Sequence, residues 1–280
     1  MTAPMKLVYL GTPEMAVPPL RALVDAGHDV VRVITRVDKK RGRGAALSPS
    51  PVKAAALELG LTVSHDPDDV LAAVDDGAEL GVVVAYGRII KPHLLDAVPM
   101  VNLHFSLLPR WRGAAPVERA MLAGDAETGV DVMRVEEGLD TGGIHAEERV
   151  PIDDAVTADE LRTRLVEVGS RVLVECLSRP LGDWIDEPQP QVGEPVYAAK
   201  LDKAEFEIDW NEPVELLHRR VRVGGMWTTF RDKRLKIHAA EVVDGRLVPT
   251  VVQPEGKGPM PFDAWRNGAQ PRPDELFGDR

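Results

Sequence analysis

Strand-sized apolar stretches alternate with helical patterns through the first part of this 280-residue chain. The predicted strands are residues 6–10, 29–35, 61–64 and 80–85, and the predicted helices between them are residues 14–26, 51–59 and 66–74. Several of these strands are apolar throughout, which is typical of a parallel sheet covered by helices on both faces. The pattern therefore predicts an α/β fold with a Rossmann-like, mostly parallel sheet.

Two polar residues interrupt the next apolar strand. Residues 101–105 alternate, so that Asn102 and His104 share one face and the apolar residues share the other. Ser106 and Pro109 then end the strand, which places Asn102 and His104 near its carboxyl edge. Open α/β sheets bind their ligands at that edge. We therefore expect a functional site around these two side chains.

A third polar side chain is expected beside them. Residues 127–135 predict another strand, and the loop 138–143 that follows carries Asp140 among glycines. An amide can donate to an oxyanion, a histidine can move a proton, and an aspartate can fix the tautomer of that histidine. Taken singly, each residue has an ordinary structural explanation, such as packing on a strand or an Asx-turn. Taken together, Asn102, His104 and Asp140 indicate acyl transfer.

The motifs around these residues resemble those of a known family. Asn102-Leu-His104, Ser106-Leu-Leu-Pro109, Gly113 and Gly138-Leu-Asp140-Thr-Gly142 resemble the signature of the folate-dependent formyltransferases, and most nearly of those that act on methionyl-tRNA. The resemblance runs from Leu10-Gly-Thr-Pro13 to Gln253-Pro-Glu-Gly-Lys257 and so covers nearly the whole chain.

The resemblance implies transfer of a formyl group from 10-formyltetrahydrofolate to the α-amino group of initiator methionyl-tRNA, with Asn102 and His104 as oxyanion donors and Asp140 orienting His104. The implied folate-binding residues are Tyr86, Gly87, Ile89, Ser106, Leu107, Leu108 and Pro109. The implied tRNA-binding residues are Arg36, Lys39, Arg41 and Arg43, in a loop over residues 36–50 that is longer than a strand-to-helix connection requires. From the sequence alone, Ile89 is more often a core residue than a cofactor contact.

The charge of the chain is acidic, with a formal net charge of −11 at pH 7. Such a chain does not bind nucleic acid over its whole surface, because phosphate binding needs local cations. Cations are nevertheless clustered, once in residues 36–43 and again in residues 219–236. Two basic patches on an acidic protein fit a polyanion held in one orientation, although each patch is equally typical of a solvated charged segment.

Other functional classes are disfavoured because their motifs are missing. Pro13 stands where a dinucleotide-binding loop needs glycine, and Ser106 lacks the Gly-x-Ser-x-Gly frame of a hydrolase. The histidines and the single Cys176 show no metal-ligand spacing, so no metal is expected, and Cys176 lies in an apolar helical pattern typical of a core residue. No membrane segment or signal-like N-terminus is predicted, and we expect a cytoplasmic monomer.

Three alternatives remain open at this point. The same core could formylate an amino-sugar nucleotide, or could use water and hydrolyse formyltetrahydrofolate. The chain could also be a non-catalytic module that binds tRNA or folate. The basic loop and the Gln253 to Lys257 motif favour tRNA as the partner.

Three segments are expected along the chain. Residues 1–180 predict the catalytic domain, closed by a long helix over residues 157–177 with a capping box formed by Thr157 and Glu160. Residues 181–197 are rich in proline and predict a semi-rigid linker. Residues 198–280 predict a small β-rich, OB-like domain, and the short stretch 241–250 indicates that its barrel is shortened.

Overall fold

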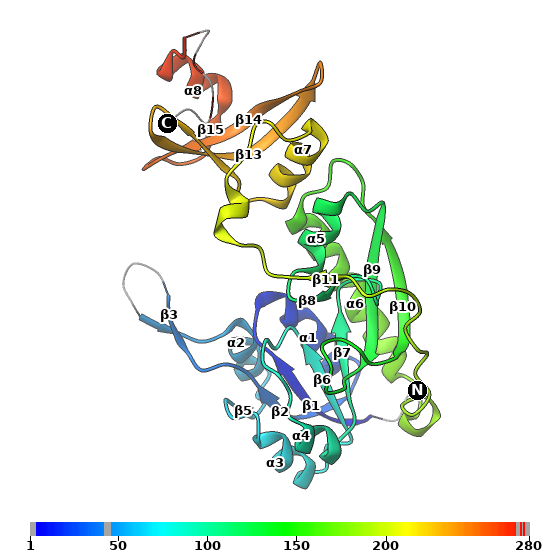
Figure 1. Cartoon of the computed structure of the whole chain (residues 1–280). Helices are drawn as coiled ribbons and strands as arrows, with labels where there is room; N and C mark the ends of the chain where they lie inside the picture. Colours follow the sequence, from blue (N-terminus) through cyan, green and yellow to red (C-terminus); the bar gives the residue numbers. More distant parts are fainter. Residues whose placement is uncertain (1–3, 42–45, 273–274, 276, 278–280) are drawn as a thin grey trace. The chain divides into compact units, whose positions relative to one another are not determined.

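The computed structural model describes residues 4–41, 46–272, 275 and 277, and the chain divides into two compact units (Figure 1). The first unit comprises Met1–Pro116, Glu127–Pro151 and Arg162–Ala198, and the second comprises Val117–Ala126, Ile152–Leu161 and Ala199–Arg280. None of the helices in the described residues combines the length and the apolar composition that a membrane crossing requires.

A seven-stranded sheet forms the centre of the first unit (Figure 1). Its strands in spatial order are β10 (Ile144–Pro151), β9 (Glu127–Arg134), β7 (Met100–His104), β6 (Leu80–Val84), β1 (Lys6–Gly11), β2 (Asp29–Ile34) and β5 (Val63–Ser64). The strands from β5 to β7 run parallel, whereas β9 and β10 are antiparallel to their neighbours. This order confirms the predicted Rossmann-like, mostly parallel sheet.

In the described residues, six α-helices belong to the segments around this sheet, and side chains cap two of them, α2 and α6. They are α1 (Val17–Asp25), α2 (Pro51–Glu58), α3 (Asp69–Asp75), α4 (Pro92–Ala97), α5 (Pro116–Ala123) and α6 (Ala158–Leu177), with short 3-10 helices at Glu14–Ala16 and Leu181–Asp183. Ser50 caps α2, because its hydroxyl accepts a hydrogen bond from the Lys53 amide at 3.0 Å. The capping box of α6 forms as predicted, with Thr157 N donating to Glu160 Oε2 at 2.9 Å and Glu160 N donating to Thr157 Oγ1 at 3.3 Å.

The two faces of β7 meet different helices. Met100 belongs to a buried cluster that includes Val70 of α3 and Leu94 of α4. Leu103 instead faces α6, where a Cβ atom on Gly169 would lie 3.1 Å from the Leu103 side chain. Because side chains alternate along a strand, Asn102 and His104 share the face of Met100. The alternation in the sequence predicted this arrangement.

The basic loop predicted over residues 36–50 contains regular structure. β3 (Lys39–Arg41) pairs antiparallel with β4 (Ala46–Ser48), so the prediction of a loop is corrected on both sides of its tip. Backbone groups there pair with each other, which a reading of charge and glycine content does not reveal. The predicted tRNA-binding residue Arg43 lies outside the described residues.

The segment predicted as a linker, residues 181–197, is tied to the first unit in its second half. Gln189 and Ile144 exchange two backbone hydrogen bonds, with N···O distances of 2.7 and 2.8 Å. β11 (Tyr197–Ala198) then pairs in parallel with β8 (Arg112–Gly113). Residues 189–198, which we call the strap, therefore have a defined path along the first unit.

The second unit is built on an antiparallel sheet of β12 (Trp227–Phe230), β13 (Lys233–Val243), β14 (Arg246–Pro254) and β15 (Met260–Pro261). The 3-10 helix Lys203–Phe206 and α7 (Val214–Val223) precede the sheet, and α8 (Phe262–Ala269) follows it. Leu217 of α7 and Trp265 of α8 pack in one core with Leu235 and Ile237 of β13. The β-rich character of this unit was predicted, whereas α8 was not.

Candidate active site

His104 lies at the carboxyl end of β7 and is held by a backbone carbonyl. Its side chain is only 6% exposed, and Nε2 lies 3.1 Å from the carbonyl oxygen of Trp111. A carbonyl oxygen only accepts, so Nε2 carries the proton of the neutral ring. Trp111 adopts a φ of +66°, a turn conformation that aims its carbonyl at the imidazole. The other ring nitrogen, Nδ1, is therefore the atom with a lone pair.

Asp140 lies beside that nitrogen, as the sequence predicted. Its Oδ2 atom is 3.8 Å from His104 Nδ1 and accepts a hydrogen bond from the Gly113 amide at 2.8 Å. Asp140 has a φ of +50°, in the left-handed region that aspartate tolerates better than most residues. The structure thus brings together an imidazole and a carboxylate that are far apart in the sequence.

Asn102 shares the face of His104 on β7 and is half-buried. Its backbone pairs with Met133 on β9 and with Val83 on β6, so the strand position is fixed on both sides. Within the described part of the chain, no group makes a hydrogen bond to its carboxamide. Asn102 therefore remains a candidate donor at this edge of the sheet.

The loop Ser106 to Pro109, predicted to bind folate, is packed among protein groups. Ser106 is fully buried and its hydroxyl donates to the carbonyl of Arg110 at 2.7 Å. Leu108 is also buried, and its amide donates to Asp131 Oδ2 at 2.7 Å. Leu107 is half-buried against β9, where a Cβ on Gly129 would overlap its side chain. These contacts give the loop a structural role next to the candidate site.

Asp131 is a buried carboxyl that the sequence analysis did not single out. The residue is 0% exposed on β9, directly opposite His104 in the sheet register. Burial raises the pKa of Asp131 to about 8, an effect that the hydrogen bond from the Leu108 amide partly offsets. Its Oδ1 atom has no partner among the described residues. A lone charged residue inside the apolar run of β9 was the available signal.

The predicted folate-binding residues after β6 separate into buried and exposed positions. Tyr86 is 2% exposed and belongs to the cluster of Leu94 and Met100, and burial raises the pKa of its hydroxyl. Gly87 accepts a hydrogen bond on its carbonyl from Arg36 Nη2 at 2.7 Å. Ile89 is 87% exposed, so it is not a core residue.

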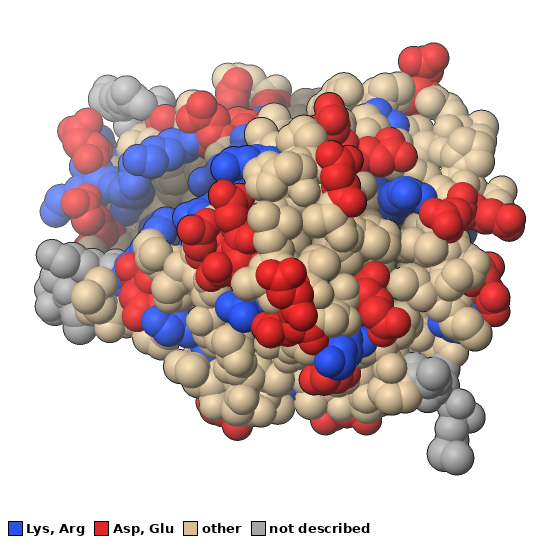
Figure 2. Space-filling model, turned by 90° about the horizontal axis from the view of Figure 1, so that it is seen from below, with Lys and Arg blue, Asp and Glu red and all other residues tan. Residues whose placement is uncertain are grey.

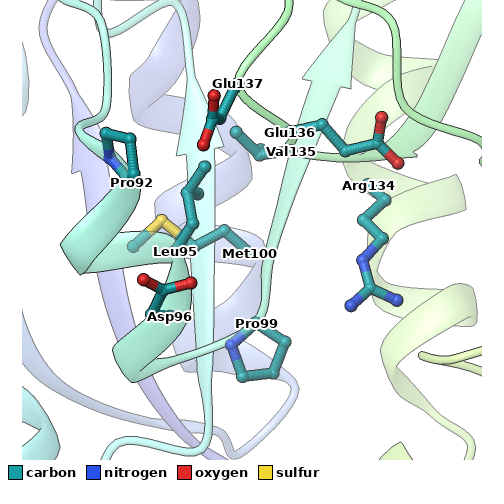
Figure 3. Close-up of a pocket in the computed structure, with 9 residues that line it drawn as sticks. All are labelled: Pro92, Leu95, Asp96, Pro99, Met100, Arg134, Val135, Glu136 and Glu137. Atoms are coloured by element: carbon teal, nitrogen blue, oxygen red, sulfur yellow. The ribbon is translucent and has the colours of Figure 1, made fainter.

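A hollow of about 410 Å³ opens next to this cluster (Figure 3). Its lining residues are Pro92, Leu95, Asp96, Pro99, Met100, Arg134, Val135, Glu136 and Glu137. Figure 3 shows Leu95 and Asp96 on α4, and Glu136 and Glu137 pointing to different sides of the loop after β9. That loop continues directly to Asp140. Met100 is two residues before Asn102 and lies on the same face of β7. Sequence reasoning missed this hollow because its walls come from two stretches, residues 92–100 and 134–137, that are far apart in the sequence.

The predicted tRNA-binding residues of the first unit have different surroundings. Arg36 is bonded to Gly87, as described above, whereas Lys39 is exposed at the start of β3. Arg41 belongs to β3, and its side chain lies outside the described part of the structure. Figure 2 shows that many Lys and Arg gather toward the left of the viewed face, whereas Asp and Glu are spread over the whole of it, the left side included.

A second basic surface lies on the sheet of the second unit. Leu235 and Ile237 point into the core, so Arg234, Lys236 and His238 project from the opposite face of β13. The Arg234 guanidinium lies 4.0 Å from the centre of the Trp227 ring, and His238 Nε2 lies 2.9 Å from Gln253 Oε1. We call these residues the sheet-face patch. It combines cations with the half-buried ring of Trp227, and cations beside an aromatic ring are typical of surfaces that bind nucleic acid.

Comparison with known proteins connects these features to one family. The family model described as formyl transferase matches residues 5–177, and the model of the formyl transferase C-terminal domain matches residues 200–247. The methionyl-tRNA formyltransferase of Symbiobacterium thermophilum is 41% identical, over 94% of this chain and 92% of its own length. That of Methylobacterium nodulans is also 41% identical, over 96% of this chain and 98% of its own.

Solved structures show the same fold. The methionyl-tRNA formyltransferase from Clostridium thermocellum matches with a TM-score of 0.60 at 15% identity, covering 91% of this chain and 100% of its own. HypX from Aquifex aeolicus, in complex with tetrahydrofolic acid, matches with a TM-score of 0.67 at 15% identity, covering 99% of this chain and 51% of its own. With both family models matched and close relatives aligned over nearly their whole length, the chain belongs to the formyl transferase family.

Proposed function

We propose that this chain transfers a formyl group from 10-formyltetrahydrofolate to the α-amino group of initiator methionyl-tRNA. The family and the relatives named methionyl-tRNA formyltransferase support this activity. The observation that carries it is the approach of His104 and Asp140 to 3.8 Å beside Asn102, at the sheet edge where ligands bind. These are the groups that an acyl transfer to an amine requires.

The proposed route of the proton is consistent with this geometry. The neutral amine attacks the formyl carbon, a C–N bond forms, and Asn102 donates its amide N–H to the oxyanion. The proton released by the amine goes to His104 Nδ1, because Nε2 already donates to the Trp111 carbonyl. Asp140 stabilises the resulting imidazolium. His104 then returns the proton to N10 of the folate as the bond between N10 and the formyl carbon breaks.

The hollow beside α4 is the proposed position of the pterin ring. Leu95, Met100 and Val135 supply apolar walls for a flat ring. Asp96 and Glu137 are carboxylates in the same lining, and they can accept hydrogen bonds from the amino group and the ring N–H of a pterin. The exposed Ile89 follows the same cluster and is available to cover the ring. A test is the binding of tetrahydrofolate to Leu95→Asp, which should weaken while tRNA binding persists.

The tRNA is proposed to contact both basic surfaces. Lys39 on the hairpin and Arg234 and Lys236 on the sheet-face patch are exposed cations in a chain of net charge −11. Phosphate contacts of this kind position a nucleic acid without reading its sequence. Arg36 was predicted to bind tRNA. Because its guanidinium donates to the Gly87 carbonyl, we propose instead that it supports the predicted folate-binding segment after β6. The proposed product serves translation initiation, so we also propose a cytoplasmic location.

One experiment tests the proposal as a whole. The full chain is incubated with 10-formyltetrahydrofolate and offered charged initiator tRNA, an amino-sugar nucleotide and water in competition. The proposal expects formyl-methionyl-tRNA as the main product and release of tetrahydrofolate in equal amount. Formylation of the amino sugar, or release of formate, would assign the site to a different acceptor.

A further inference from the structure

One side chain on the strap has all its hydrogen-bonding groups engaged with the candidate active site. Gln191 Oε1 accepts from Arg112 Nε at 3.1 Å and from Arg112 Nη2 at 2.5 Å. Gln191 Nε2 donates to the carbonyl oxygens of Asp140 and Gly142, each at 2.8 Å. A glutamine side chain offers two N–H donors and one acceptor oxygen with two lone pairs, so this amide is fully used.

Gln191 connects the two segments that shape the His104 and Asp140 pair. One segment is Trp111 to Gly113, whose carbonyl and amide hold His104 Nε2 and Asp140 Oδ2 respectively. The other segment is the loop that carries Asp140 itself. The amide therefore fixes the distance between the groups that orient the imidazole and the backbone that carries the carboxylate.

The loop needs this connection because its backbone is strained and crowded. Asp140 has a φ of +50°, and a Cβ on Gly142 would lie 2.0 Å from the Arg134 carbonyl oxygen. Strained conformations persist only where surrounding groups hold them. The two bonds from Gln191 Nε2 lie on either side of Thr141 and hold both ends of the turn.

We infer that Gln191 is a positioning residue for formyl transfer, which acts by holding the Asp140 carboxylate against His104. The inference rests on the proposed function. Gln191 bonds only to protein groups and is not itself a catalytic residue. Because the chemistry depends on placement within a fraction of an ångström, loss of the hydrogen bonds of the Gln191 side chain should reduce kcat by about 10-fold to 100-fold. The KM for the folate donor should change by less than about threefold, since the hollow does not include Gln191.

The variants separate the hydrogen bonds that Gln191 accepts from those that it donates. Gln191→Glu keeps the oxygens that accept from Arg112 but removes the donors to Asp140 and Gly142, so it should lose kcat like Gln191→Ala. The matched control is Gln189→Ala, two residues away on the strap, because Gln189 is exposed and its bonds to Ile144 use only the backbone. This control should keep the wild-type kcat.

A double-mutant cycle with Asp140→Asn distinguishes positioning from general destabilisation. If Gln191 acts through Asp140, Gln191→Ala should cause little further loss of rate in the Asp140→Asn background, measured under single-turnover conditions. Hydrogen exchange of the 138–143 segment should rise in Gln191→Ala and stay unchanged in Gln189→Ala. Additive losses in the cycle, or wild-type kcat in Gln191→Glu, would overturn the inference. The cycle can be run with whichever acceptor the wild-type chain formylates, so its failure is distinct from failure of the tRNA proposal.

Discussion

The buried carboxyl of Asp131 should make the stability of the protein fall as the pH rises. Burial raises its pKa from an ordinary value of 3.8 to about 8 in the folded chain. Between these two values the folded protein binds more protons at this group than the unfolded protein does. The free energy of unfolding therefore decreases with increasing pH in this window, and the stabilisation is fully present only below the unfolded pKa.

The size of the effect follows from the two pKa values. Each pH unit inside the window changes the free energy of unfolding by about 1.4 kcal/mol, so the interval from about pH 5 to about pH 7 corresponds to roughly 2 to 3 kcal/mol. Asp131→Asn does not titrate and keeps an oxygen for the Leu108 amide. The advantage of Asp131→Asn over the wild type should therefore grow by this amount across the interval.

Urea denaturation of the two proteins side by side, at several pH values in this interval, measures the difference. All other titrating groups, including the nearby Glu147 and Arg149, are present in both chains and cancel. Asp131→Val is the second variant, because it also removes the titration but leaves the Leu108 amide without a partner. It should lie below Asp131→Asn by about 1 to 3 kcal/mol at every pH. Parallel curves for wild type and Asp131→Asn would refute the argument from burial.

Three further outcomes are expected. Asn102→Ala and His104→Ala should lower turnover by about 10²-fold to 10³-fold and 10²-fold to 10⁴-fold respectively, with tetrahydrofolate binding nearly intact, in a formylation assay; normal turnover in either would exclude the mechanism. Arg234→Ala should weaken tRNA binding and reduce the slope of log K against log salt by roughly one, and an unchanged slope would remove the sheet-face patch from the interface. Arg36→Ala should raise the Kd for tetrahydrofolate without changing that salt slope, because its guanidinium bonds to Gly87; the opposite pattern would make Arg36 a tRNA contact.

Local pattern was sufficient for the sheet and for the common face of Asn102 and His104. The alternation around Asn102 and His104 gave their common face, and the glycine loop after the next strand placed Asp140 beside them. The common face of Asn102 and His104 depends on neighbours within a few residues, where periodicity is informative, whereas the place of Asp140 depends on a loop far along the chain that follows another strand of the sheet. The family resemblance added the substrates, which spacing alone does not give.

Contacts that depend on distant backbone could not be read from the sequence. The partner of His104 Nε2 is a carbonyl in a left-handed turn at Trp111, and a tryptophan gives no sign of that conformation. The loop from Ser106 to Pro109 carries part of the family signature, yet its groups bond to Asp131 and Arg110. The motif drew attention to this loop, whereas its packing contacts with Asp131 and Arg110 come from the three-dimensional structure, and folate binding by the loop stays a prediction.

Asp131 and Gln191 each hold a loop near His104, but Asp131 does so with an ionisable carboxyl and Gln191 with a neutral amide. Asp131 accepts a hydrogen bond from the Leu108 amide, and Gln191 donates to the carbonyls of Asp140 and Gly142. Both loops lie outside the paired strands of the sheet. The amide of Gln191 is neutral and fully bonded, so its contribution does not depend on pH. The carboxyl of Asp131 keeps one oxygen without a partner and stays favourable only while protonated. Rising pH should therefore lower the free energy of unfolding through the buried carboxyl of Asp131, whereas the contribution of Gln191 stays constant.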